Sequence, residues 1–295
     1  MSGSIHSADR ISGLPEDILV TILSRLPMKE AARTTILSHR WRNLWPHTTG
    51  TLDFDGSKIL WALKLYIELG MMDTDPEPYR PGYISWVNQI LNSHKGATID
   101  ELKVHFALDL TSRLDIDGWI NFALQKRAQK LELDLEQPEP NWEKIYPFPS
   151  QYLGNPTIDS LRSLKLNFVD VTGEVLESFL SNCPFLEIVC VRSSPCLVGV
   201  KVSAASPKLK YLEISRCRNV EVLDISSINL TSLTYSGPVA RLCFKNAPNL
   251  TDVSFGGAYC GDIVQKFHNL SIPLSCIEKL KLNLVSHVSE PAPFF

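Results

Sequence analysis

Long apolar runs, clustered basic residues and catalytic signatures are all missing from this sequence. No stretch approaches the roughly 20 consecutive apolar residues that a membrane-spanning helix needs, and the first ten residues lack the pattern of a secretory signal. No run of lysine or arginine is longer than a pair, and the formal net charge is −3. The sequence therefore predicts a protein of the nucleus or cytoplasm, with neither a membrane nor a nucleic acid as its partner.

The cysteine and histidine spacings do not fit the common disulfide, metal and catalytic patterns. Seven cysteines form an odd set without a C-x-x-C pair, which favours reduced, mostly buried thiols over a disulfide framework or a zinc knuckle. The seven histidines are scattered, and no G-x-S-x-G, H-E-x-x-H or glycine-rich phosphate loop occurs. Glu132 and Asp134 are paired carboxylates, but on a strand they are typical of a solvated face. We therefore expect no catalysis, no metal and no cofactor.

Residues 11–45, by contrast, carry a dense helical pattern. Pro15 suits the first turn of a helix, Glu16 and Asp17 place negative charge at its positive end, and Pro27 ends it. About half of the circumference of this helix is apolar. The residues concerned are Leu14, Ile18, Leu19, Ile22, Leu23 and Leu26.

Two more helical patterns follow, from Lys29 to about Leu37 and from Ser38 to Trp45. Three short helices in about 35 residues form a unit below the size at which a hydrophobic core is usually self-sufficient. Part of the apolar surface is therefore expected to meet another surface, either a partner protein or the rest of this chain.

These residues resemble an F-box in order and spacing. The matching segments are Leu14-Pro15-Glu16-Asp17, Ile22-Leu23-Ser24, Leu26-Pro27, Ala31-Ala32-Arg33, Leu37-Ser38 and Arg40-Trp41-Arg42-Asn43-Leu44-Trp45. His39 stands where the family often has a basic residue, which is a mild departure. The resemblance implies docking to a Skp-type adaptor and, through it, to the cullin and RING subunits of a ubiquitin ligase. The adaptor contact that it implies comprises Leu14, Pro15, Ile18, Leu19, Ile22, Leu26, Pro27, Leu37, Trp41, Leu44 and Trp45.

Residues 51–98 are expected to connect the F-box, taken as residues 8–50, to the rest of the chain and to cap it. Thr51–Asp55 alternates like a strand, and Lys58–Leu69 has helical periodicity. Residues 73–82 contain three prolines and are predicted to form a loop. Helical spacing then returns between Ile84 and Leu91.

From residue 99 to about 290, one pattern recurs that we call the apolar phrase. It consists of an apolar residue, two other residues, a second apolar residue, one other residue and a third apolar residue, as in Ile99-x-x-Leu102-x-Val104. Its central residues are Leu102, Leu131, Leu164, Val189, Leu212, Leu233, Val253 and Leu280, separated by 20 to 33 residues. Such steps indicate leucine-rich repeats, and Cys217 stands where these repeats place a cysteine at the bend. We therefore predict an α+β or α/β fold in which a three-helix F-box precedes an irregular leucine-rich-repeat solenoid.

The outer side of the solenoid is expected to change along the chain. Additional apolar triplets at 220–225 and 239–244 predict short outer strands, because coils of 20 to 21 residues leave little room for a helix. Longer coils are predicted to hold helices at 118–127 and 175–180. Residues 291–295 form a poor polar cap, so either the chain is a shortened version of a longer protein or this end meets a partner.

The whole chain resembles plant-type F-box proteins with leucine-rich repeats, although the C-terminal FBD module of many members is not recognised in it. The resemblance implies a non-catalytic substrate receptor whose repeats bind a target protein for ubiquitination. Since side chains alternate along a strand, the outward positions are the candidates for target binding. They are Lys103, His105, Glu132, Asp134, Lys165, Asn167, Arg192 and Glu213, with Thr234, Ser254 and Lys281 beyond them.

Two alternatives to this receptor remain open. The F-box could dock the adaptor without delivering a substrate, which would make the chain a binding scaffold. The helices could instead serve only as a cap for a repeat protein that binds ligands on its concave face. Adaptor binding separates the last hypothesis from the other two, and ligase-dependent loss of a target separates the receptor from the scaffold.

Overall fold

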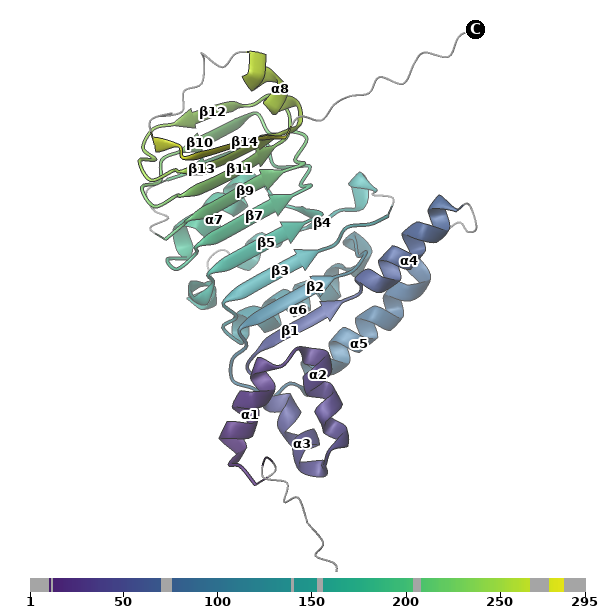
Figure 1. Ribbon diagram of the computed structural model, residues 1–295. Helices are drawn as coiled ribbons and strands as arrows, with labels where there is room; N and C mark the ends of the chain where they lie inside the picture. The colour runs from purple at the N-terminus through teal and green to yellow at the C-terminus, as the bar shows by residue number, and fades with distance from the viewer. Residues whose placement is uncertain are drawn as a thin grey trace, which may run out of the picture.

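A parallel sheet of nine strands organises the computed structural model (Figure 1), in the order β1-β2-β3-β5-β7-β9-β11-β13-β14. The strands are β1 (Thr51–Asp55), β2 (Glu101–His105), β3 (Lys130–Asp134), β5 (Ser163–Asn167), β7 (Ile188–Arg192), β9 (Tyr211–Ser215), β11 (Ser232–Ser236), β13 (Asp252–Gly256) and β14 (Lys279–Asn283). The structure describes residues 11, 13–69, 76–138, 141–152, 156–203, 208–265 and 276–283.

The register of this sheet confirms the repeat that the apolar phrase predicts. The central residue of each phrase pairs with that of the next, beginning with Leu102 opposite Leu131 and ending with Val253 opposite Leu280. Each coil therefore stacks on its neighbour with its central apolar residue in one row, which is buried from Leu102 to Val253 and exposed at Leu280. Leu52 of β1 pairs with Leu102, so the strand predicted at 51–55 is the first strand of the same sheet.

Helices cover one face of the first coils, where the core lies. They are α5 (Arg80–Ser93), α6 (Arg113–Gln125) and α7 (Gly173–Asn182) (Figure 1). Tyr83 of α5 stacks on Phe106 with ring centroids 4.3 Å apart, and Trp119 of α6 is buried beside them. The helices predicted at 118–127 and 175–180 correspond to α6 and α7, but both begin earlier because turns and caps precede the apolar residues. Asp109 caps the turn before α6, and Thr172 caps α7.

Later coils carry strands on the outer side of the solenoid, as the additional apolar triplets at 220–225 and 239–244 predict. A second sheet has the order β12-β10-β8, formed by β8 (Gly199–Val202), β10 (Val222–Ile225) and β12 (Arg241–Phe244). The predictions at 220–225 and 239–244 are confirmed, whereas β8 and α8 (Gly257–Gln265) were not predicted. β4 (Tyr146–Pro147) and β6 (Val169–Asp170) form a small third sheet.

A helical hairpin of α4 (Ser57–Glu68) and α5 follows β1. Residues 73–75 of the predicted loop at 73–82 lie outside the described residues. The prediction is wrong for Arg80–Gly82, which is the first turn of α5, whereas Pro76 forms a bend and Glu77–Tyr79 a 3-10 turn before it. A proline is compatible with the first turn of a helix, where its missing N–H has no partner to lose.

The N-terminal unit contains the helices α1 (Glu16–Arg25), α2 (Met28–Arg33) and α3 (His39–Leu44), with 3-10 turns at Thr34–Ile36 and Trp45–His47. The second predicted helix, Lys29 to Leu37, is thus an α-helix only as far as Arg33. Ser38 caps α3 by accepting a hydrogen bond from the Trp41 backbone N–H at 3.4 Å. Thr49 N donates to Ser24 Oγ at 2.9 Å, which ties the chain leading into β1 to α1.

Candidate functional site

Helix α1 has two apolar stripes, one buried and one exposed. Leu19 and Leu23 are 0% and 1% exposed and form the core of the N-terminal unit with Ala31, Trp41 and Leu44. Ile18 and Ile22, also four residues apart, remain 44% and 36% exposed. The N-terminal unit is too small to cover both stripes, so the second one is available to a partner.

The turn between α2 and α3 exposes two more large apolar side chains. Ile36 is 85% exposed and Leu37 64% exposed. Arg40 Nη2 donates to the Leu14 carbonyl oxygen at 2.7 Å and so connects the beginning of α3 to the residues before α1. We call the exposed apolar set of this unit the docking face. It comprises Ile11, Ile18, Ile22, Ile36 and Leu37.

The structure separates the residues predicted to contact the adaptor into three groups. Ile18, Ile22, Leu37, Pro15 and Pro27 are exposed, and Leu14, Leu26 and Trp45 are partly buried against the small core. Leu19, Trp41 and Leu44 are buried within that core, which corrects their assignment as direct contacts: they support the docking face but have almost no surface to offer. Ile11 and Ile36 were missed because neither continues a helical apolar stripe.

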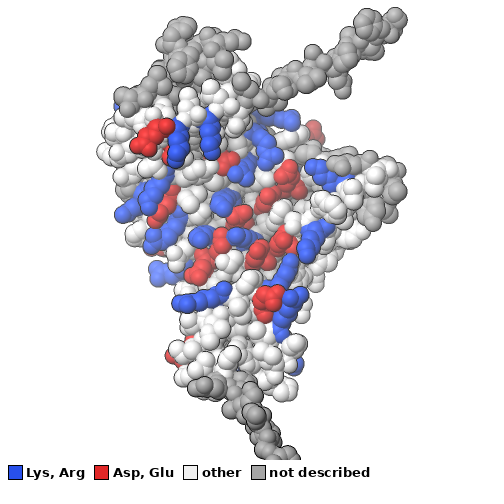
Figure 2. Space-filling view, viewed as in Figure 1, with Lys and Arg blue, Asp and Glu red and all other residues white. Residues whose placement is uncertain are grey.

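Outward side chains form a second surface, on the face of the nine-stranded sheet that α6 and α7 leave uncovered. Lys103, Glu132 and Lys165 lie at successive register positions of β2, β3 and β5, and this row continues through Cys190 to Glu213. A parallel row runs from Asp55 through His105, Asp134 and Asn167 to Arg192. Figure 2 shows acidic and basic side chains mixed over this face. We call the two rows the charge ladder.

Ion pairs within the charge ladder neutralise much of its charge. Lys165 Nζ lies 3.0 Å from Glu132 Oε2. Burial lowers the pKa of Lys165, but the hydrogen bond and the charge of Glu132 act against it, and the net effect is a raised pKa. His105 lies between two carboxylates, 3.9 Å from Asp55 and 3.9 Å from Asp134. The ladder therefore has little net charge of either sign to attract a partner.

Arg192 and Glu213 form the best-defined pair. Arg192 Nε and Nη2 donate to the two oxygens of Glu213 at 2.6 and 2.8 Å. Burial alone would raise the pKa of Glu213, but the hydrogen bonds and charge of Arg192, together with hydrogen bonds from Ser215 and Tyr211, hold that pKa below its ordinary value. Tyr211 Oη and Ser215 Oγ also donate to Glu213.

Two ladder residues are less accessible than the outward positions predict. Glu213 and Asn167 are buried by their neighbours, because the side chains beside them reach across to form hydrogen bonds. Asn167 donates to Asp134 at 2.8 Å, but its buried amide oxygen has no hydrogen-bond partner among the described residues. Lys103, His105, Glu132, Asp134 and Lys165 are partly exposed, and Arg192 is exposed.

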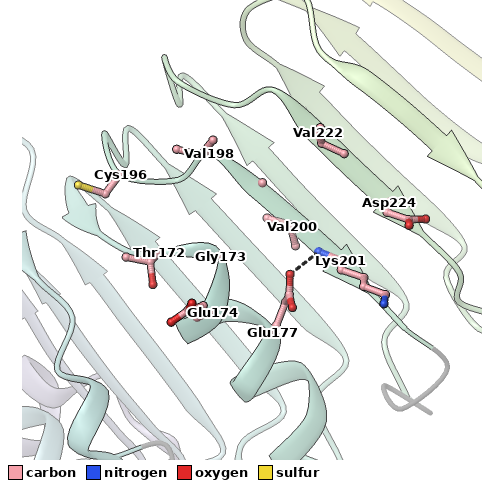
Figure 3. A pocket seen from close by; sticks show the side chains of 11 residues that line it. Thr172, Gly173, Glu174, Glu177, Cys196, Val198, Val200, Lys201, Val222 and Asp224 are labelled. Atoms are coloured by element: carbon pink, nitrogen blue, oxygen red, sulfur yellow. Dashed lines mark hydrogen bonds between the residues drawn. The ribbon is translucent and has the colours of Figure 1, made fainter.

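A shallow groove of about 580 Å³ lies on the outer side of the solenoid, between α7 and the edge strand β8 of the second sheet (Figure 3). Glu177 accepts a hydrogen bond from the Lys201 backbone N–H at 2.9 Å. The Glu177 carboxylate thus satisfies a backbone N–H of β8 that could otherwise form a hydrogen bond with another strand. The groove is best explained as a protected sheet edge.

All seven cysteines lie in the described part of the chain, and all are free thiols, four of them buried. Burial raises the pKa of Cys183 and of Cys190 to about 12 in each case. Within the described ranges, no helix is both long and apolar enough to span a membrane.

Comparisons with known proteins agree with this architecture. The F-box domain model matches residues 11–47, and a model described as the At1g61320/AtMIF1 LRR domain matches residues 154–292. The putative F-box/LRR-repeat protein At5g02700 of Arabidopsis thaliana is 30% identical over 62% of this chain and 38% of its own length. The putative F-box/FBD/LRR-repeat protein At4g13965 of the same plant is 28% identical over 94% of this chain and 64% of its own length.

The helical unit and the leucine-rich solenoid thus define a chain that joins an F-box to repeats. The chain carries an F-box domain and a leucine-rich-repeat domain, and it is similar over most of its length to plant F-box/leucine-rich-repeat proteins. It spans 38% to 64% of the lengths of the first curated relatives that it matches.

Proposed function

We propose that this chain is a substrate receptor of a Skp-cullin-F-box ubiquitin ligase. The F-box docks a Skp-type adaptor, which connects it to the cullin and RING subunits, and the repeats bind a target protein. The chain performs no chemistry itself. Its contribution is proximity, because holding a target next to a ubiquitin-charged carrier raises the effective concentration of the reacting lysine. Such a role places the protein in the nucleus or cytoplasm.

The observation that carries the proposal is the exposure of five large apolar side chains on one small helical unit. Ile36 and Leu37 project from a turn, and Ile18 and Ile22 extend the apolar surface along α1. Exposed apolar surface of this kind is typical of a protein-binding site. The buried residues Leu19, Trp41 and Leu44 hold these side chains in place, so the F-box is a supported and largely preformed interface.

For the target, we propose the accessible part of the charge ladder as a contact surface. Lys103, His105 and Asp134 are partly exposed, so their polar groups can form hydrogen bonds with a bound protein. Because the ladder neutralises its own charge, it favours a partner that offers hydrogen bonds in register over one attracted by net charge alone.

Replacing Ile18 and Ile22 together by alanine tests the proposal at α1. Both side chains are partly exposed, so the double variant should fold while its affinity for a purified Skp-type adaptor falls about tenfold, measured by isothermal titration calorimetry. The matched control replaces Ile59 by alanine, an isoleucine of similar exposure on α4 outside the F-box. An Ile18/Ile22 variant that binds like the wild type would exclude this face of α1 from the interface.

A reconstituted ligase distinguishes a receptor from a scaffold. A target captured by the repeats should be ubiquitinated when the chain is assembled with adaptor, cullin, RING protein and charged carrier. Capture without modification of the target would favour the scaffold.

A further inference from the structure

Helix α4 presents an apolar stripe that no other described part of the chain covers. Trp61 is 68% exposed, Leu65 is 36% exposed, and Leu69, directly after the helix, is 56% exposed. Their spacing of four residues places them on one side of the helix, over a length of about 12 Å. A tryptophan is the residue with most to gain from burial at an interface, and here it is the most exposed of the three.

Two lysines flank this stripe. Lys58 lies three residues before Trp61 and Lys64 three residues after it, so both share its side of the helix. Both are exposed, whereas Lys165 and Arg192 of the charge ladder form ion pairs with Glu132 and Glu213. Positive charge beside Trp61 thus faces the solvent.

The stripe adjoins the proposed target surface. Gly56 N donates to the His105 carbonyl oxygen at 2.9 Å, and Ser57 N donates to Asp55 Oδ1 at 2.8 Å. These bonds connect the beginning of α4 to the carboxyl ends of β1 and β2. Asp55 thus belongs both to the charge ladder and to the turn that begins α4. Figure 1 shows α4 beside these strand ends, away from the F-box helices.

We propose that this stripe, comprising Lys58, Trp61, Lys64, Leu65 and Leu69, binds an amphipathic helical segment of the target protein, one with acidic residues beside its apolar side. The inference rests on the proposed receptor function and specifies the chemistry of the target. Apolar side chains one helical turn apart match the i and i+4 positions of a partner helix, and carboxylates complement the exposed lysines Lys58 and Lys64.

The charges around α4 favour a helix over an anionic membrane as the occupant. Asp53 and Asp55 lie on β1 immediately before the helix. A membrane surface is broad and would have to approach these carboxylates as well as the lysines. A helix is only about 10 Å wide and can follow the stripe alone.

The test is a selection of displayed helical peptides against the full chain bound to its adaptor. The library contains 24-residue amphipathic helices with glutamate or lysine at the positions beside the apolar side. We expect glutamate-flanked peptides to be enriched. Replacing Trp61 and Leu65 by alanine should weaken the selected peptides about 30-fold or more. The charge reversal K58E/K64E should weaken them and remove the salt dependence of their binding.

Leu114→Ala provides the matched control, because Leu114 is a fully solvated leucine on α6, 86% exposed, and its loss should leave peptide binding unchanged. Three results would overturn the inference: no enriched peptide, peptides whose affinity is insensitive to Trp61→Ala, or lysine-flanked peptides. So would a Trp61-dependent dimer in light scattering or Trp61-dependent sedimentation with phosphatidylcholine/phosphatidylserine vesicles. Adaptor binding is measured on the same samples, and its failure would count against the receptor function separately.

Discussion

Replacing both Ile36 and Leu37 by aspartate should lower the affinity of the chain for a Skp-type adaptor at least about 100-fold. These are the two most exposed large apolar side chains of the F-box. Central interface residues typically contribute about 2 kcal/mol each, and 1.4 kcal/mol corresponds to a factor of ten in affinity. Aspartate adds a charge that would have to be desolvated in the complex. Titration calorimetry measures the loss.

The corresponding control is Leu114→Asp, because that leucine is as exposed as Ile36 but lies on α6. Circular dichroism and thermal unfolding should show that all these variants keep the fold, since neither Ile36 nor Leu37 contributes to a core. Wild-type affinity in the folded I36D/L37D variant would exclude this turn from the adaptor contact.

Arg80→Ala should destabilise the fold by about 3 kcal/mol. The guanidinium lies at the beginning of α5, where Nη1 is 3.0 Å from Asp109 and Nε donates to the Ala107 carbonyl oxygen at 2.9 Å. The side chains of Arg80 and Asp109 are only 5% and 4% exposed. Removing one partner leaves the other charge buried with fewer hydrogen bonds, which typically costs 3 kcal/mol or more. Urea-induced unfolding measures the change in the free energy of unfolding.

Arg33→Ala is the control for this loss. Arg33 forms an ion pair of 2.7 Å with Glu30, but both side chains are largely in water. Exposed pairs contribute between nothing and about 1 kcal/mol, so the alanine variant should unfold almost like the wild type. If both variants lost the same free energy of unfolding, burial would not be the reason why the Arg80 ion pair stabilises the fold.

The strands of the solenoid could be predicted from the sequence because their physical cause is local and repeated. Apolar residues at alternate positions face the core from β2 to β13, and the same phrase also marks β14, where Leu280 and Leu282 are each 37% exposed. Strand β8 was missed although Leu197-x-x-Val200-x-Val202 has the same form as the triplet at 220–225, and all three of its apolar residues are buried. Its pairing with β10 follows from that shared pattern.

The F-box surface could be predicted only in part. The apolar pattern of α1 shows that half of the helix is hydrophobic, but it cannot show which stripe the small core takes. The structure assigns Leu19 to the core and leaves Ile18 outside. For the same reason Trp41 and Leu44 were taken as contacts, although they pack against α1 instead. A tryptophan that is conspicuous in the sequence is often an anchor of the core.

Contacts between distant segments were beyond sequence reasoning. The residues around Arg80 read as a proline-rich loop, because the partner that stabilises them, Asp109, lies 29 residues later. Outward positions of the charge ladder followed from strand alternation, yet their pairing depends on the register between strands. Glu213 is consequently a buried acceptor for Arg192 rather than a freely available carboxylate.

Co-elution with a purified Skp-type adaptor in size-exclusion chromatography tests the central claim most directly, when the full chain is compared with a chain lacking residues 1–50. We predict a stoichiometric complex with the full chain and none with the truncated chain, whose repeats should remain folded by circular dichroism. A well-folded full chain that does not co-elute with the adaptor, or a truncated chain that still does, would contradict the assignment of the F-box as the docking module.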